Sequence, residues 1–313
     1  MTNLSEFTFL SSDGKTQLHG MLWEPEGVAV RAVLQICHGV AEHIARYDGF
    51  ARALNEQGIV VAGHDHLGHG KSLPEGGTPV YFGEGNTWNT VVDDIYVLHQ
   101  RLKQRYPDAP LCIMGHSMGS FLTRTYLIRY PGTVKAAIIM GTGWQPRAAI
   151  TGGLALANAI AAVSGENATS ELVTELAFGS YNKLFAPNRT KVDWLSADES
   201  NVDDYIADPL CGADATVGLF RQMLHGIRFN QRQSHLRQMD REMPVLFVAG
   251  DKDPVGNCGK GVRQTYDAFR AAGMRDCTLK LYPGLRHEIL NEKAYTADIT
   301  KNIEAWLLSR LEK

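Results

Sequence analysis

The chain has 313 residues, of which 44% are hydrophobic and 21% are charged, and its formal net charge is −3. These values are typical of a globular protein of one large domain or two ordinary ones. The small net charge and the lack of a run of lysine and arginine argue against nucleic-acid binding. Five scattered cysteines without a C-x-x-C pair indicate a reduced, cytoplasmic compartment. The amino terminus lacks a signal-peptide pattern, and we expect no apolar stretch long enough to span a membrane.

The predicted elements begin with a β-hairpin, in which residues 6–10 and 17–23 flank a glycine-containing turn. From residue 31 onward, short apolar runs alternate with amphipathic stretches such as residues 90–105. This alternation predicts an α/β protein with a mostly parallel sheet, flanked by helices on both faces. The predicted strands of this sheet are residues 32–37, 59–62, 111–114, 136–140, 245–249 and 278–282.

The rhythm breaks between about residues 144 and 235, where we predict no strand. This segment begins with an alanine-rich apolar run, residues 148–163, and continues as a polar helical region. Ligands of parallel sheets bind beyond the carboxyl ends of the strands, so we interpret the insertion as a helical cap over that edge. Extra packing is the alternative interpretation. The predicted division is a core, residues 1–143 and 236–313, and a cap, residues 144–235.

The sequence Gly-His-Ser-Met-Gly, residues 115–119, stands between a predicted strand and a predicted helix. This is the context of a nucleophile elbow, in which a tight strand-to-helix turn exposes a serine hydroxyl. Glycine is needed on both sides of the serine because a Cβ there would clash. Ser117 is therefore the candidate nucleophile.

A serine hydroxyl needs a base that takes its proton and a carboxylate that orients the base. In one known arrangement the acid and then the histidine follow the serine along the chain. Asp253 lies on the loop after the strand at residues 245–249, with Asp251 as its competitor nearer the strand end. His287 follows the last strand and precedes the final helix. We predict Asp253 as the acid and His287 as the base.

Acyl transfer also needs donors aimed at the developing oxyanion. One candidate is the backbone N–H of Met118, directly after the nucleophile. The other should come from the loop after the first parallel strand, where the N–H of Val40 is the best placed. We expect His38 in this loop to be structural.

Three further histidines, His64, His66 and His69, have a spacing that resembles a metal-ligand set. A dinuclear hydrolase motif would need an aspartate where this chain has Gly68. We therefore predict no metal and no other cofactor, and we interpret the segment as a tight loop that supports the oxyanion region.

Five motifs, taken together and in this order, resemble the monoacylglycerol lipase and lysophospholipase branch of the α/β-hydrolases, with a domain of the serine aminopeptidase S33 type. The motifs are residues 38–43 with Arg46 and Tyr47, residues 65–72, residues 115–119, residues 250–253, and His287. The resemblance implies an α/β-hydrolase fold and the roles given above for Ser117, Asp253, His287, Val40 and Met118. It also makes Glu42 and Arg46 candidate substrate contacts.

The implied activity is hydrolysis of the carboxylic esters of acyl lipids through an acyl-enzyme, in the manner of a lysophospholipase or monoacylglycerol lipase. Leu290 stands where mammalian monoacylglycerol lipases carry a second histidine, which speaks against a glycerol-specific site. The alternatives are an aminopeptidase-type hydrolase, a non-lipid carboxylesterase, and a binding module with an inert pocket. The expected partner is a small acyl ester or lipid, with at most peripheral membrane contact through the cap.

Overall fold

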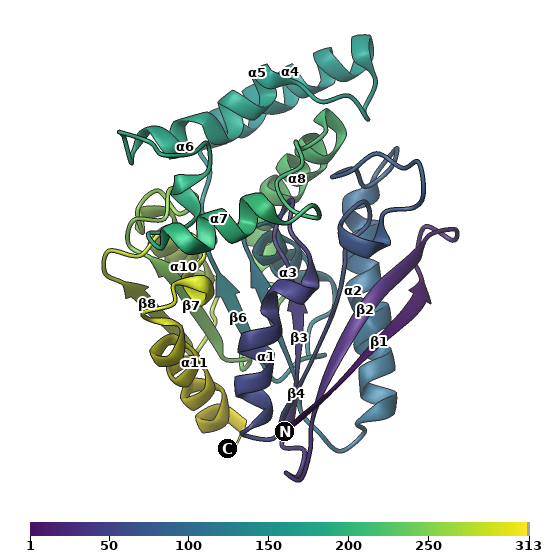
Figure 1. Ribbon diagram of the computed structural model, residues 1–313, viewed down its shortest axis with the longest axis vertical. Coiled ribbons are helices and arrows are strands. Elements are labelled where there is room, and N and C mark those ends of the chain that lie inside the picture. The colour runs from purple at the N-terminus through teal and green to yellow at the C-terminus, as the bar shows by residue number, and fades with distance from the viewer. Residues whose placement is uncertain (312–313) are drawn as a thin grey trace.

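A single twisted sheet forms the centre of the molecule (Figure 1). The computed structural model describes residues 1–311, and in this range eight strands pair in the order β1-β2-β4-β3-β5-β6-β7-β8. The pairs β1–β2 and β2–β4 are antiparallel, and all the others are parallel. The strands are β1 (Thr2–Leu10), β2 (Gln17–Pro25), β3 (Ala32–Cys37), β4 (Ile59–His64), β5 (Leu111–His116), β6 (Ala136–Met140), β7 (Val245–Gly250) and β8 (Cys277–Tyr282).

The central strands have the composition that burial on both faces requires. Every residue of β3, β4, β5, β6 and β7 is buried, and these strands are continuous runs dominated by apolar and small side chains. The predicted hairpin and all six predicted strands are present, and β3 and β6 begin and end at the predicted residues. The predicted α/β fold class is confirmed.

Helices cover both faces of the sheet and bury two separate hydrophobic clusters. One cluster involves α1 and α11, and the other involves α2, α3 and α10. In α1 the apolar residues Phe50, Ala51 and Leu54 fall on one helical face, which packs toward the sheet. These helices are α1 (Asp48–Asn55), α2 (Thr87–Arg105), α3 (Met118–Arg129), α10 (Lys260–Ala271) and α11 (Thr296–Leu311).

A helical segment between β6 and β7 lies beyond the carboxyl edge of the sheet, and its upper layer crosses the top of Figure 1. Parallel strands end at this edge, so their following loops and the helical segment share it. Its helices are α4 (Arg147–Ser164), α5 (Glu171–Thr174), α6 (Ser180–Lys183), α7 (Glu199–Ala207), α8 (Val217–Asn230) and α9 (Gln233–Leu236). We refer to residues 144–235 as the cap, and its division from the core stays a prediction.

Helix α4 differs from the sequence-based expectation in one respect. It is long and apolar enough to cross a membrane, with 18 residues and a mean hydropathy of 1.3, and only 17% of it is buried. The expectation that no apolar stretch reaches the length of a membrane span was therefore wrong. The helix is apolar along its whole length because alanine and glycine are its commonest residues and Arg147 is its only charged residue. An apolar helix is therefore displayed on the outer side of the cap.

Candidate active site

Ser117 lies at the sharp turn between β5 and α3. Its φ of 54° and ψ of −122° lie in a region that residues other than glycine seldom adopt. The turn needs glycine on both sides, because a Cβ on Gly115 would collide with the carbonyl of Gly119, and one on Gly119 with the carbonyl of Cys37. The backbone thus has the form of a nucleophile elbow, with the serine at the amino terminus of a helix.

His287 and Asp253 form a buried pair on the loops after β8 and β7. His287 Nδ1 lies 3.0 Å from Asp253 Oδ1, and the two side chains are 2% and 0% exposed. A carboxylate in this position holds the Nδ1–H tautomer and leaves Nε2 to accept a proton. The competing Asp251 does not contact the histidine, and its Oδ1 accepts a hydrogen bond from the N–H of Gly284 at 2.8 Å.

Two backbone donors at the site have no acceptor. Within residues 1–311, neither the N–H of Val40 nor that of Met118 makes a hydrogen bond. Gly39 packs directly on the nucleophile, since a Cβ there would lie 3.1 Å from Ser117 Cβ. His38 is structural, as expected: it is fully buried and its Nδ1 lies 2.8 Å from the Gly39 carbonyl. Free N–H groups next to a serine are what an oxyanion hole requires.

Glu42 is the centre of a buried network that holds this loop. Burial opposes its ionisation, but the hydrogen bond and charge of His116 and the charge of Arg46 hold the pKa of Glu42 well below its usual range. Its oxygens accept hydrogen bonds from the Gly39 N–H (2.5 Å), the Tyr47 hydroxyl (3.0 Å), His116 Nδ1 (3.1 Å) and Arg46 (3.1 Å). Both carboxylate oxygens are therefore committed to the protein.

Arg46 extends the network to the loop that carries the histidine. Its guanidinium binds both oxygens of Glu288, at 2.7 and 2.8 Å, across 242 residues of chain. Burial disfavours charge on Glu288, yet the charge of Arg46 keeps the pKa of this carboxyl below its usual value. Sequence reasoning offered Glu42 and Arg46 as substrate contacts, but the geometry favours a positioning role, because their polar atoms face protein partners. The sequence-based prediction did not include Glu288, whose only signal in the sequence is its place next to His287.

His116 joins the two halves of the site. Its Nδ1 lies 3.1 Å from Glu42 and its Nε2 lies 3.3 Å from the carbonyl oxygen of His287. Burial lowers the pKa of His116, but the bond to Glu42 and its charge outweigh burial and raise it. The protonated ring can donate from both nitrogens to these two acceptors. Because His116 directly precedes Ser117, the network ties the nucleophile turn to both neighbouring loops.

The segment after β4 is a hydrogen-bonded loop around Asp65. This carboxylate accepts from the backbone N–H groups of Ile44 and Lys71, at 2.8 and 2.9 Å, and contacts His19 Nδ1 at 2.9 Å. Burial works against the charge, but the bond from His19 is among the contacts that lower the pKa of Asp65 to about 2.

The three histidines with metal-like spacing are packing residues of the same region. His64 and His66 lie 5.1 Å apart and His66 and His69 lie 6.5 Å apart, measured between ring centroids. Burial is the largest cause that lowers the pKa of His64 and His69 to about 3, so both are neutral. The rings of His66 and His69 pack against that of His38, at 4.2 and 5.4 Å between ring centroids.

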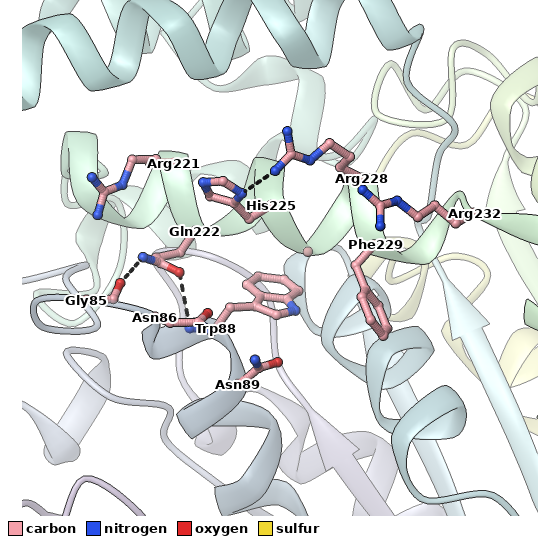
Figure 2. Close-up of a pocket in the computed structure, with 11 residues that line it drawn as sticks. Gly85, Asn86, Trp88, Asn89, Arg221, Gln222, His225, Arg228, Phe229 and Arg232 are labelled. Atoms are coloured by element: carbon pink, nitrogen blue, oxygen red, sulfur yellow. Dashed lines mark hydrogen bonds between the residues drawn. The ribbon is translucent and has the colours of Figure 1, made fainter. Parts of the chain in front are cut away.

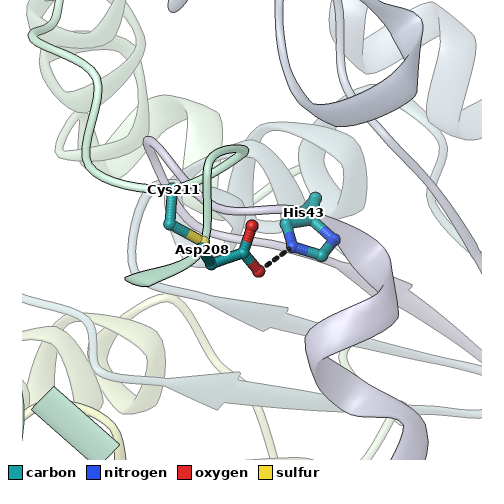
Figure 3. A group of neighbouring side chains, drawn as sticks. All are labelled: His43, Asp208 and Cys211. Atoms are coloured by element: carbon teal, nitrogen blue, oxygen red, sulfur yellow. Dashed lines mark hydrogen bonds and ion pairs between the residues drawn. The ribbon is translucent and has the colours of Figure 1, made fainter. Parts of the chain in front are cut away.

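A second group of side chains joins the cap to the loop after β3, residues 38–43 (Figure 3). His43 Nε2 lies 2.8 Å from Asp208 Oδ2. Cys211 Sγ lies within 4.8 Å of a ring nitrogen of His43 and of a carboxylate oxygen of Asp208. Burial is the largest cause that raises the pKa of the Cys211 thiol, which keeps it protonated. Two further bonds reach the Ala41 carbonyl, from the hydroxyl of Tyr205 and the N–H of residue 212. This part of the cap is therefore anchored beside the two free donors.

Aromatic side chains from the cap form one wall beside His287. The ring of Trp194 lies 5.1 Å from the His287 ring. Phe178 stacks on Trp194 at 6.4 Å, and Tyr181 meets it edge-on at 5.2 Å. Sequence reasoning gave these residues no role, since aromatic positions in a helical insertion are also typical of ordinary packing. The cap therefore packs an aromatic cluster against the ring of His287.

Comparisons with protein families, protein sequences and solved structures all identify relatives that are hydrolases. The family model for serine aminopeptidases of type S33 matches residues 28–294. The monoacylglycerol lipase of Mycolicibacterium smegmatis is 30% identical, with 98% of each chain covered, and the human monoglyceride lipase is 27% identical, with 96% of this chain and 89% of the human chain covered. The crystal structure of a thermostable carboxyl esterase from Bacillus coagulans in complex with glycerol superposes with a TM-score of 0.92 and 26% identity, covering 99% of this chain and 100% of that one. The chain therefore belongs to the serine aminopeptidase S33 family of α/β-hydrolases.

Proposed function

We propose that this protein hydrolyses carboxylic esters of acyl lipids, with Ser117, His287 and Asp253 as the catalytic triad. Its full-length relatives include monoacylglycerol lipases, and its structural neighbours include lipases and esterases; the chain is accordingly a carboxylic ester hydrolase. The observation that carries the assignment of residues is the strained Ser117 backbone beside a buried His287–Asp253 pair and two unpaired N–H groups.

Each group has one task in the proposed reaction. Ser117 Oγ attacks the ester carbonyl carbon while His287 Nε2 takes the hydroxyl proton, and Asp253 holds the resulting imidazolium. The N–H groups of Val40 and Met118 donate to the oxyanion, and each such donor is worth about 10²- to 10³-fold in kcat. His287 returns the proton to the departing alcohol. Water then attacks the acyl-enzyme by the same proton route, and the acid leaves.

The cap supports an apolar acyl group as the substrate part that enters from its side. Phe178, Tyr181 and Trp194 place aromatic surface next to His287, where a polar group would lose hydration without gaining a partner. Glu42 and Arg46, in contrast, act as positioning residues in this proposal. The division into core and cap, with residues 144–235 as the cap, is part of the same proposal.

The test is a series of p-nitrophenyl esters from acetate to laurate, with a monoacylglycerol and a lysophospholipid as natural substrates. We expect kcat/KM to rise with acyl length, because apolar burial contributes about 0.8 kcal/mol per methylene. Ser117→Ala should abolish turnover of every ester, while Asp251→Asn serves as the matched control. Equal kcat/KM for all acyl lengths would support a non-lipid carboxylesterase instead.

The family name makes peptidase activity the second candidate. A peptidase acting at amino termini needs a carboxylate that meets the substrate ammonium group. Glu42 is the nearest candidate, but its side chain is 4% exposed and its oxygens are already bonded. We therefore expect no hydrolysis of alanine p-nitroanilide under conditions in which p-nitrophenyl butyrate is cleaved. Comparable rates on both would assign the chain to the peptidases of the family.

We also propose a cytoplasmic location. The five cysteines are all free, and Cys37 and Cys112 are buried in β3 and β5. Burial raises the pKa of both thiols to about 12, so they are inert packing residues rather than disulfide partners.

A further inference from the structure

Two adjoining cavities lie along helix α8, and neither is lined by Ser117, Asp253 or His287. The larger, about 430 Å³, lies between α8 and the start of α2, and Figure 2 shows its lining side chains. The smaller, about 260 Å³, lies between the start of α4 and the end of α8. Arg228 and Arg232 line both, and Arg147 closes the smaller cavity from the α4 side.

The arginines of the smaller cavity are not balanced by acids. Among the residues that the structure describes, no aspartate or glutamate lines either cavity. Within residues 1–311, Arg147, Arg228 and Arg232 form no ion pair, whereas the neighbouring Arg221 is paired with Glu166 at 2.5 Å. All three guanidinium groups are exposed, so water and salt weaken their mutual repulsion, and an anion held between them would lower it further.

Arg147 lies at a position where a positive charge is unfavourable. It is the first residue of α4, at the positive end of an 18-residue helix with no acidic residue in its first turn and no side-chain cap. A cation is unfavourable at this end of a helix, whereas an anion is favourable. Arg228, in the last turn of α8, is explained by that helix alone, but Arg147 is not. An anion in the cavity would stabilise the charges of Arg147 and Arg228 and the start of α4.

The potential in the larger cavity is also positive. Arg221, His225, Arg228 and Arg232 follow one another at helical spacing along one stripe of the α8 region, as Figure 2 shows. Arg228 contacts His225 Nδ1 at 3.0 Å. Burial is the first cause that lowers the pKa of His225, and the charges of Arg228 and Arg221 lower it further. Glu166 neutralises Arg221, so the positive field of the larger cavity comes from Arg228 and Arg232, which the two cavities share.

We propose that the cavity of Arg147, Arg228 and Arg232 is a binding site for a phosphate group. Guanidinium groups bind phosphate through paired N–H donors, and a phosphate monoester offers one free oxygen to each of the three arginines, whereas a carboxylate has only two oxygens. The phosphate is carried either by a small soluble ester or by a lipid headgroup. The lipid form is compatible with the exposed apolar surface of α4, which begins at the same residue.

The experiment measures binding directly and does not depend on ester hydrolysis. Calorimetry with glycerol 3-phosphate, against sodium chloride at equal ionic strength, tests the soluble form. Co-sedimentation with vesicles of phosphatidylcholine and phosphatidic acid, whose headgroup is a phosphate monoester, tests the lipid form. Vesicles of phosphatidylcholine with oleate at equal charge remove the anionic phosphate. The variants are Arg147→Gln and Arg232→Gln. Arg263→Gln is the control, because Arg263 is exposed on α10 and lines neither cavity.

Each cavity variant should weaken phosphate binding about tenfold or more, since a hydrogen-bonded ion pair is lost, and the control should not change it. All these arginines lie outside the catalytic network, so unchanged turnover of p-nitrophenyl butyrate verifies that the variants fold. Binding to glycerol 3-phosphate assigns a soluble ligand, and binding to phosphatidic acid vesicles alone assigns a headgroup. Binding to neither, equal binding to oleate vesicles, or equal loss in Arg263→Gln overturns the proposal.

Discussion

Glu42 offers the sharpest test of the positioning network. Glu42→Ala removes the acceptor of four hydrogen bonds and the partner of Arg46 and His116. Breaking a buried ionic contact by removing one partner costs about 3–5 kcal/mol of stability. Arg46 keeps both bonds to Glu288, so we expect a loss near 3 kcal/mol, at the lower end of that range.

The effect on catalysis follows from the geometry of the loop. The Gly39 N–H loses its anchor at 2.5 Å, and Val40, the next residue, carries the proposed oxyanion donor. Misplacing one such donor lowers kcat about 10²- to 10³-fold. In the proposed mechanism the substrate does not touch Glu42, so KM should stay within about a factor of three of the wild-type value.

The assay is steady-state hydrolysis of p-nitrophenyl butyrate together with urea unfolding. Glu42→Gln is the matched variant: its carbonyl oxygen can replace the oxygen that binds Gly39, Tyr47 and His116, so we expect a fall in kcat of only about tenfold. Glu56→Ala, an exposed position at the end of α1, is the surface control. A tenfold rise in KM with unchanged kcat would refute this reasoning and make Glu42 a substrate contact.

Three further predictions concern single positions. Asp253→Asn should lower kcat about 10⁴-fold because the histidine loses the partner of Nδ1, while Asp251→Asn should leave kcat nearly unchanged, as stopped-flow hydrolysis can measure. Asp65→Asn should cost about 2 kcal/mol at pH 7, since the lowered pKa of Asp65 contributes stability that is present above about pH 4 and lost as the pH falls through about 2; urea unfolding at pH 7 and pH 2 measures it. Trp194→Ala should raise KM for long acyl esters more than for the acetate, because it removes apolar surface beside His287.

Each of these predictions has an outcome that contradicts it. Equal losses in the two aspartate variants would remove the assignment of Asp253. A stability difference between wild type and Asp65→Asn that persists at pH 2 would show that charge is not its source. A uniform change in KM across the ester series would mean that Trp194 packs the cap and does not meet the acyl chain.

Much of the core could be predicted from local patterns. The strands are short apolar runs that are buried on both faces, so their composition marks their position, and β3 and β6 were bounded correctly. The elbow was predictable because its glycines and serine are contiguous in the sequence. Loops after successive parallel strands meet at one edge, which is why Asp253 and His287 could be paired across 34 residues.

The network behind the site could not be predicted in the same way. The bond between Arg46 and Glu288 joins residues 242 positions apart, and nothing in either local sequence distinguishes a buried charge from a solvated one. For this reason Glu42 and Arg46 were interpreted as substrate contacts. The exposure of α4 was missed on similar grounds, because an alanine-rich helix has the same composition whether it packs inside a cap or faces outward.

The most direct test of the central claim is the site of covalent labelling by a fluorophosphonate. Such a probe reacts with a serine only when a base and an oxyanion hole activate it. Intact-mass and peptide analysis of the labelled protein should place one adduct on Ser117, with no adduct on Ser117→Ala and slow labelling of Asp253→Asn. An adduct on another residue, or an unlabelled protein that still hydrolyses p-nitrophenyl butyrate, would contradict the proposed catalytic role of Ser117.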